Sequence, residues 1–174
     1  MTKKVFLIEL SDRSVAETIS ELKEYQRVMN EKRSRLQRLI AEKICQKSQQ
    51  GFTGAIVDDL TTQSGGARFA NVTVSVKDGD GVTVVVASGT DAVWVEFGAG
   101  VYHNGAQGSS PNPYGNDLGF TIGGFGTNGK KATWGFKENG ELKITRGTPA
   151  TRPMFNAVQE IVGEIERLVK EVYG

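Results

Sequence analysis

The 174 residues suffice for one domain of ordinary size with a hydrophobic core. Lys and Arg number 21 and Asp and Glu 20, so the net charge is too small to favour nucleic acid or an anionic membrane surface. No apolar run approaches the ~20 residues that cross a bilayer, and the single cysteine, Cys45, excludes an internal disulfide.

The first part of the chain predicts a short strand followed by a long helical region. Residues 5–10 are apolar apart from Glu9, which together with the missing cleavage site argues against a secretory signal. Ser14 and Glu17 form a capping box, which predicts the start of a helix. Apolar residues then recur at helical spacing, in a helix that would extend to Gln50 if it is unbroken: Val15, Ile19, Leu22, Met29, Leu36, Ile40 and Ile44. Because the stretch around Asn30 is polar on every face, we expect two helices, or one whose middle stands free of the domain.

From residue 71 the apolar period changes to two, which predicts an antiparallel meander. Valines alternate with polar residues over two segments separated by the turn Asp78-Gly79-Asp80-Gly81: Val72, Val74, Val76 and Val82, Val84, Val86. A second turn at residues 88–91 leads into residues 92–97, which we predict to be the third strand.

Residues 98–150 have the composition of a long insertion. Thirteen of the 50 residues from 98 to 147 are glycine, and too few apolar groups remain to order such a segment alone. One part has a clear structural signal, because Asn139-Gly140 predicts a hairpin between strands at 132–136 and 141–145. We expect an arm, partly hairpin and partly loop, that becomes ordered on a neighbouring molecule. Its candidate contact residues are aromatic: Tyr102, Tyr114, Phe120, Phe125 and Trp134.

The chain ends in a predicted amphipathic helix. Thr151 is the expected N-cap, and Pro153 fits the first turn because that position needs no N–H. The apolar stripe that follows has to cover another element, and the valine face of the meander is available: Met154, Val158, Ile161, Ile165, Leu168 and Val172. We therefore predict a single α+β domain, residues 1–174, with helices packed on one sheet.

Catalytic, metal and nucleotide sites are not predicted. Residues 124–129 match G-x-G-x-x-G, but the residues that follow read as a strand where the phosphate-binding motif requires a helix. His103 is the only histidine, so a zinc site lacks ligands and a Ser-His-Asp triad lacks its Gly-x-Ser-x-Gly elbow. No cofactor, small-molecule substrate or enzymatic activity is therefore expected.

Two motifs resemble those of a known family, the tail-completion or neck proteins of long-tailed bacteriophages. The first motif is Trp94-Val95-Glu96-Phe97-Gly98 and the second is Arg152-Pro153-Met154-Phe155, where the family usually carries Val-Glu-Phe-Gly-Thr and Arg-Pro-Phe-x-x-Pro-Ala. A weaker match is Phe52-Thr53-Gly54, with Phe52 in the place of the family's arginine. The order of the elements also agrees. Ala99 replaces the usual threonine, and 53 residues separate Gly98 from Arg152 where relatives have a short gap.

The resemblance implies a structural protein of the virion, assembled in the host cytoplasm and located in the tail or neck. It would complete the tail and take part in head–tail joining as a ring of copies, expected to be hexameric. Its partners would then be other copies of itself and the tail-tube, terminator or connector proteins, with DNA only passing through the ring and no membrane involved.

The two motifs also predict a contact within the chain. If the insertion loops out and back, Gly98 and Arg152 come close, so Glu96 and Arg152 can form an ion pair with a structural role. In the predicted strand, Glu96 shares a face with Trp94, opposite Phe97. The proposed partner or structural residues are those of the two motifs: Trp94, Glu96, Phe97, Gly98, Arg152, Pro153 and Phe155.

Two other readings remain open. A tail terminator or head-side connector has the same size and α+β build, and only its position in the particle distinguishes it. A glycan- or surface-binding module could instead stack sugars on loop aromatics, namely Trp134, Tyr102, Tyr114 and Trp94. An enzyme is the weakest alternative, because no pair of titratable residues has a convincing spacing.

Overall fold

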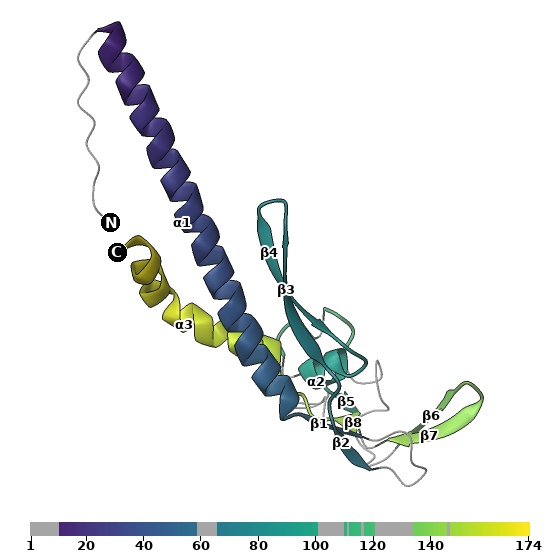
Figure 1. Cartoon of the computed structure of the whole chain (residues 1–174). Coiled ribbons are helices and arrows are strands. Elements are labelled where there is room, and N and C mark those ends of the chain that lie inside the picture. The colour runs from purple at the N-terminus through teal and green to yellow at the C-terminus, as the bar shows by residue number, and fades with distance from the viewer. Residues whose placement is uncertain are drawn as a thin grey trace.

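The computed structural model describes residues 11–58, 66–100, 110, 112–115, 117–120, 134–145 and 147–174. The strand predicted at residues 5–10, His103, the glycine motif at 124–129, Tyr102 and Phe125 lie outside these residues. Within them the fold is α+β, as predicted, with a long N-terminal helix, short antiparallel strand pairs and a C-terminal helix (Figure 1).

Helix α1 (Asp12–Thr53) is one continuous helix of 42 residues. It contains no proline, and its first glycine is Gly51, in the last turn. Arg27 forms ion pairs with Glu24 and Glu31 along the polar middle, which supports the helix there. The capping-box prediction was three residues late, because Ser11 is the N-cap and its Oγ accepts a hydrogen bond from the backbone N of Ser14.

Helix α3 (Pro153–Tyr173) runs antiparallel to the C-terminal half of α1 (Figure 1). A Cβ placed on Gly51 would lie 2.9 Å from Cβ of Pro153, so the two backbones approach closely at this end. Lys47 pairs with Glu160 further along, and at the far end Nζ of Lys32 lies 5.7 Å from the ring centre of Tyr173. Of the two expected forms, two helices is wrong, because α1 is continuous. The polar stretch around Asn30 lies where the N-terminal half of α1 begins to extend beyond the end of α3.

Strands β3 (Thr73–Gly79) and β4 (Val82–Ser88) form the hairpin predicted by the valine alternation, with Val76 opposite Val85. Asp80 and Gly81 both have positive φ, of 25° and 78°, in the tight turn. Arg38 of α1 pairs with Asp78 and ties the hairpin to the helix. Where the hairpin meets α1 lies the core, built from Phe52, Ala55, Val57, Val74 and Val95.

The third strand of the predicted meander is instead a short helix, α2 (Ala92–Phe97). Its buried residues Ala92, Val95 and Glu96 follow helical i, i+3, i+4 spacing, and Gly98, with a φ of 81°, ends the helix by donating its N–H to the carbonyl of Trp94. The apolar alternation over six residues could not separate the two structures, because it is too short.

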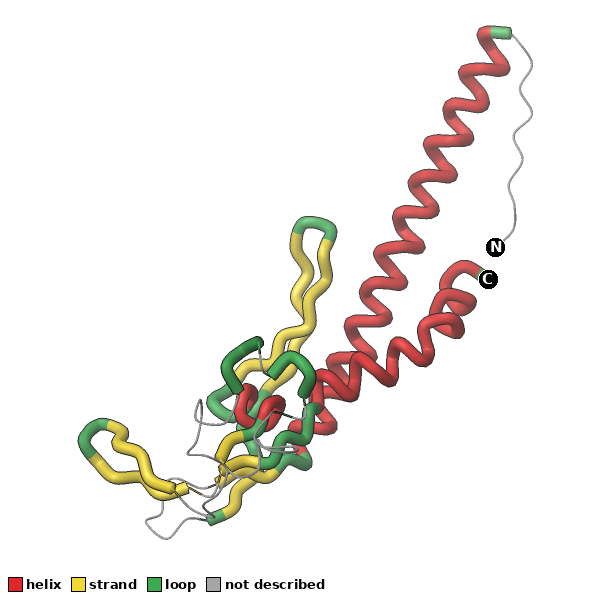
Figure 2. The backbone as a smooth tube through the Cα atoms, turned by 180° about the vertical axis from the view of Figure 1, so that it is seen from behind, coloured by secondary structure: helices red, strands yellow, loops and turns green. Residues whose placement is uncertain are grey.

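Three further strand pairs are short. β1 (Ile56–Asp58) pairs with β2 (Ala67–Phe69), and β5 (Ala99–Gly100) pairs with β8 (Gly147–Thr148). The second pair brings the two ends of the insertion together. The predicted hairpin in the insertion is formed by β6 (Trp134–Glu138) and β7 (Glu141–Thr145) around Asn139-Gly140, and it extends away from the other strands (Figure 2).

Candidate functional site

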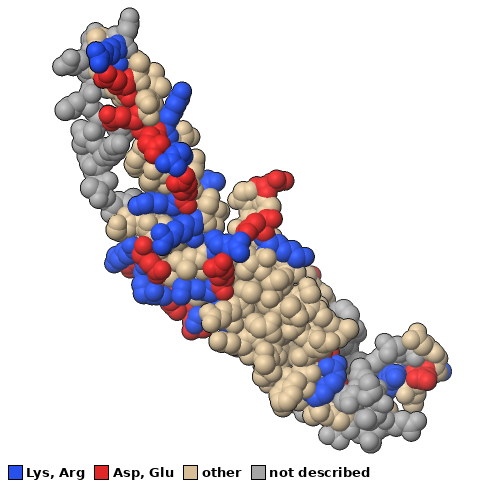
Figure 3. Space-filling view, in the orientation of Figure 1, with Lys and Arg blue, Asp and Glu red and all other residues tan. Residues whose placement is uncertain are grey.

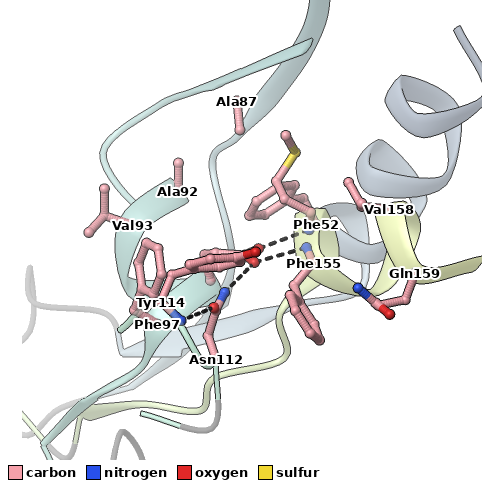
Figure 4. A pocket seen from close by; sticks show the side chains of 12 residues that line it. Phe52, Ala87, Ala92, Val93, Phe97, Asn112, Tyr114, Phe155, Val158 and Gln159 are labelled. Carbon is pink, nitrogen blue, oxygen red and sulfur yellow. Dashed lines mark hydrogen bonds between the residues drawn. The ribbon is translucent and has the colours of Figure 1, made fainter. Parts of the chain in front are cut away.

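The carboxylate of Glu96 joins three segments that are far apart in sequence. Its Oε2 accepts a hydrogen bond from the backbone N of Met154 at 2.8 Å, and its Oε1 accepts one from the backbone N of Phe155 at 3.0 Å. The Nδ2 of Asn112, in the insertion, donates to Oε1 at 2.8 Å. Figure 4 draws these hydrogen bonds as dashed lines. Helix α2, the insertion and the start of α3 therefore meet at one buried carboxylate.

Glu96 acts as the N-terminal cap of α3 from another element. The first N–H groups of a helix have no partner within it, and a negative charge there also interacts favourably with the helix dipole. Pro153 has no N–H, so Met154 and Phe155 carry the first free donors and Glu96 binds both. The predicted N-cap, Thr151, is not used: the cap position belongs to Arg152, which makes no side-chain cap hydrogen bond.

The backbone just before α3 is also held by α2. The carbonyl of Val95 accepts hydrogen bonds from the backbone N of Thr151 at 3.0 Å and of Arg152 at 3.4 Å. Arg152 has left-handed backbone angles, with φ 56° and ψ 50°. An L residue is strained in this region, so the contacts around it have to stabilise a sharp turn into the helix.

Residues of the insertion complete the junction. The hydroxyl of Ser110 donates to the carbonyl of Phe97 at 2.7 Å, and Phe120, only 5% exposed, stacks on Phe97 with ring centres 4.6 Å apart. Tyr114 is 63% exposed but lies edge-on to Phe155. Tyr114 and Phe120 therefore belong to the body of the domain. Trp134 begins β6, in the separate hairpin.

Burial raises the pKa of Glu96 above its ordinary value of 4.5. The hydrogen bonds from Met154, Phe155 and Asn112, and the positive charge of Arg152, offset only part of the cost of burying the charge. Arg152 thus acts on Glu96 as a nearby charge, whereas the backbone N–H groups of Met154 and Phe155 and the side chain of Asn112 donate hydrogen bonds to it. The guanidinium of Arg152 lies 5.8 Å from the ring centre of Phe155.

A second buried carboxylate, Asp91, fixes the start of α2. Arg68 donates to its two oxygens at 2.7 and 2.9 Å, and the backbone N of Asn71 donates to Oδ2 at 2.7 Å. Burial raises the pKa of Asp91, but the hydrogen bonds from Arg68 and Asn71 and the charge of Arg68 together lower it below its ordinary value of 3.8. This bidentate pair ties β2 to α2.

An open apolar pocket of about 390 Å³ lies beside the junction. Its walls come from α1, β4, α2, the insertion and α3, and Glu96 and Asn112 supply polar groups (Figure 4). Both of these polar side chains are engaged with each other, and Glu96 also with the α3 backbone. The junction is therefore chemically suited to holding segments in place.

The structure brings all seven motif residues predicted from the sequence to this junction. Trp94 lies edge-on to Phe120 at 6.0 Å, and Pro153 is buried at the start of α3. In the helix α2, Glu96 lies next to the buried Val95, which corrects the expectation that it faces the same side as Trp94. The sequence analysis missed Asn112 and the Asp91–Arg68 pair. Asn112 carries no motif, and Asp91 stands at the turn before α2 but makes no side-chain cap hydrogen bond there, because its carboxylate binds Arg68 and Asn71.

Among the described residues no group of three or more His, Cys, Asp or Glu side chains could hold a metal ion. The helices of that same part of the chain include none with the length and apolar character needed to cross a membrane. No protein-family model matches the chain, and neither a curated protein nor a solved structure matches it.

Proposed function

We propose that this protein is a structural subunit of a tailed bacteriophage that completes the tail and joins it to the head. The observation that supports this most is the junction at Glu96. The two motifs that resemble the neck proteins are separated by 53 residues, yet Glu96 of the first motif caps the helix that the second motif opens. Such a contact gives both motifs one structural role, which fits a building block.

The exposed parts of the molecule also fit an assembling subunit. Beyond the core, the N-terminal half of α1 and the hairpins β3–β4 and β6–β7 project outward (Figures 1 and 2). These projections carry exposed apolar side chains, at Val15, Ile19, Leu22, Val82, Val84, Leu142 and Ile144. Apolar groups that are exposed on several projecting elements favour contacts with other chains.

Ring formation follows from the proposed role. A subunit at the end of a tail tube has to match the rotational symmetry of the tube, and head-to-tail contacts close into a ring when the rotation between neighbours closes. We infer six copies from the resemblance, located between the tail tube and the terminator or connector proteins. A terminator or connector subunit would differ only in its position along the axis of the tail.

A complementation experiment tests the proposal. The gene is deleted from the genome of a phage that carries it. The lysate of the deletion strain is then examined by electron microscopy, where filled heads and separate tails are expected. Purified wild-type protein added to the lysate should restore joined, infectious particles, whereas buffer or an unrelated protein of the same size should not. Joined particles at normal yield in the deletion strain would contradict the role.

A reconstruction of the complemented particles then gives the position. Density for a ring at the tail end that faces the head is the expected result. A ring on the head side of that joint would favour the connector alternative, and protein that restores infectivity without entering the particle would contradict a structural role.

A further inference from the structure

Thr18, in the projecting half of α1, is only 8% exposed, although no described element reaches it. Helix α3 ends where Tyr173 meets Lys32, which lies about 20 Å farther along α1 at 1.5 Å per residue. Figures 1 and 2 show every described strand nearer to the C-terminal half of α1. A further segment therefore has to cover this side of the helix.

The hydrogen bond of Thr18 within the helix does not account for its burial. Its hydroxyl donates to the carbonyl of Ser14 at 2.9 Å. The hydroxyl of Thr53 donates in the same way to the carbonyl of Gln49 at 2.8 Å, and yet Thr53 is exposed. A threonine on α1 that bonds to its own preceding turn thus stays accessible unless something else packs on it.

The residues around Thr18 are apolar and partly covered. At 100° per residue, Val15, Leu22 and Tyr25 lie within about 60° of Thr18 around the helix. They are 41%, 45% and 39% exposed. Val162, a helical valine on α3, is 60% exposed, so Val15 is more covered than a valine on an open helix face. The covered side is thus centred on Thr18 and includes parts of its apolar neighbours.

We propose that residues 5–10, which we call the return segment, fold back in extended form and cover this side of α1. The N-cap Ser11 has extended backbone angles, with φ −130° and ψ 147°. Leu10 immediately precedes the N-cap, and Val15 is the fourth residue of the helix. Apolar residues at these two positions pack together as a hydrophobic staple, which fixes the direction from which the chain enters the helix.

The length and the pattern of the return segment fit the covered side. Its six residues span about 20 Å when extended, and α1 rises about 17 Å from Ser14 to Tyr25. Successive side chains of an extended chain point to opposite sides, so the polar Glu9 faces water when Leu10 faces the helix. Every second residue then packs on α1: Phe6, Ile8 and Leu10.

The charges of the two segments are complementary. Residues 12–31 carry five acidic and three basic side chains, and Figure 3 shows charged groups along this projecting helix. Lys3 and Lys4 directly precede the return segment, so folding back brings two positive charges alongside an acidic helix. Attraction between exposed charges is weak, and the apolar contact therefore supplies most of the stabilisation.

The return segment gives the projecting part of α1 a packing partner. Most of the stability of a helix in a protein comes from tertiary packing of its apolar face. Residues 12–31 lie beyond the end of α3, so the return segment supplies that packing here. The cover is one-sided: Ile19, about 100° around the helix from Thr18, is 48% exposed and remains available to other chains.

Disulfide trapping tests the contact in the full-length chain. In a Cys45→Ala background, Ile8→Cys is combined with Thr18→Cys. Measured from the staple, Ile8 lies about 7 Å along the return segment and Thr18 about 5 Å along the helix, which brings them to nearly the same level. Ile8→Cys with Ser20→Cys is the matched control, because Ser20 lies about 160° around the helix from Thr18.

Both pairs are read out on the same peptides. Trypsin cleaves after Lys4, Arg13 and Lys23, so either link joins peptides 5–13 and 14–23 within one chain. After mild oxidation the Thr18 pair should be linked and the Ser20 pair should not, since a disulfide needs the two Cα atoms within roughly 7 Å. Equal linkage in the two pairs, or none in the Thr18 pair, would overturn the proposal.

Hydrogen exchange of full-length variants gives a second readout. Ile8→Asp should speed exchange of the amides of residues 14–25 by about tenfold, the effect of losing one buried apolar side chain. Leu7→Asp, the neighbouring position that faces water, is the matched control and should have little effect. Exchange in residues 36–48, which lie beside α3, should not change. Equal effects of the two variants would contradict the alternation.

The concentration dependence excludes another occupant. If the protection of residues 14–25 in the wild type falls on dilution, a second copy provides the cover and the inference fails. Protection that is independent of concentration is the expected result. Both experiments use the purified chain alone, so their outcome does not depend on the proposed function in the phage.

Discussion

Glu96 binds the backbone N of Met154 at 2.8 Å across 58 positions of sequence, and this contact determines where the last helix begins. The carboxylate replaces the side-chain cap that a Ser, Thr or Asp at the cap position would provide. Because Asn112 binds the same carboxylate, the insertion is connected to the start of α3 through one side chain.

Removing the carboxylate of Glu96 should destabilise the protein more than removing an exposed carboxylate does. We expect Glu96→Ala to lower the free energy of unfolding by about 2 kcal/mol or more, because a helix loses its cap and two backbone donors lose their partner. Urea unfolding followed by circular dichroism measures the change. Glu166→Ala, which removes an exposed carboxylate on α3, is the control and should cost under about 0.5 kcal/mol. Equal losses would contradict the capping role.

The raised pKa of Glu96 predicts a pH dependence that its amide variant lacks. Since its pKa is higher in the folded than in the unfolded chain, protonation stabilises the fold, and that stabilisation is complete below pH 4.5 and lost as the pH rises through the folded-state pKa. The stability of wild type relative to Glu96→Gln should therefore increase as the pH falls from 7 to 4.5. A relative stability that instead decreases over this range would show that the folded-state pKa is lowered.

Asp91 should behave in the opposite way. Its pKa is lowered, so the stability that it provides is present above pH 3.8 and is lost as the pH falls through its folded-state pKa. At pH 7 the free energy of unfolding of Asp91→Asn should be about 2 kcal/mol lower than that of wild type, which is the typical cost of losing hydrogen bonds to a charged partner. The difference from wild type should shrink in acid. Arg68→Lys, which keeps the charge but not the two-pronged geometry, should lose part of the same free energy.

The main helices and both hairpins were predictable from the sequence, because each has a periodic or turn signal, and the seven motif residues of the junction were predictable from their resemblance to a known family. Contacts to backbone groups were not predictable, because residue types do not reveal them. Nothing in the residue types around Arg152 indicates that the N–H groups of Met154 and Phe155 bind Glu96. Helix α2 was not predictable either, because its six residues, Ala92–Phe97, fit either period. The interactions that distinguish the helix are the packing of Val95 and the bond from Gly98, and neither is local to the pattern.

The insertion shows the same limit in another way. Its glycine content predicts little core of its own, yet Ser110, Asn112 and Phe120 are buried against α2. The residues next to these three in the sequence form no recognisable motif. Their role is therefore visible only from their contacts with α2 in the folded chain. The expectation that the entire insertion is an arm for other molecules therefore changes: part of it closes the junction, and the β6–β7 hairpin stays available for contacts.

Arg152 provides the last test, because its backbone and its side chain make separable contributions. With φ at 56°, a residue with a Cβ is strained by about 1 kcal/mol, whereas glycine is not. Arg152→Ala and Arg152→Gly lose the same guanidinium, including its position over the ring of Phe155 and its charge near Glu96. The glycine variant should therefore be more stable than the alanine variant by about 1 kcal/mol in urea unfolding. If alanine proves the more stable of the two, the turn into α3 does not need the left-handed conformation, and Glu96 would have to cap a helix that enters along a different path.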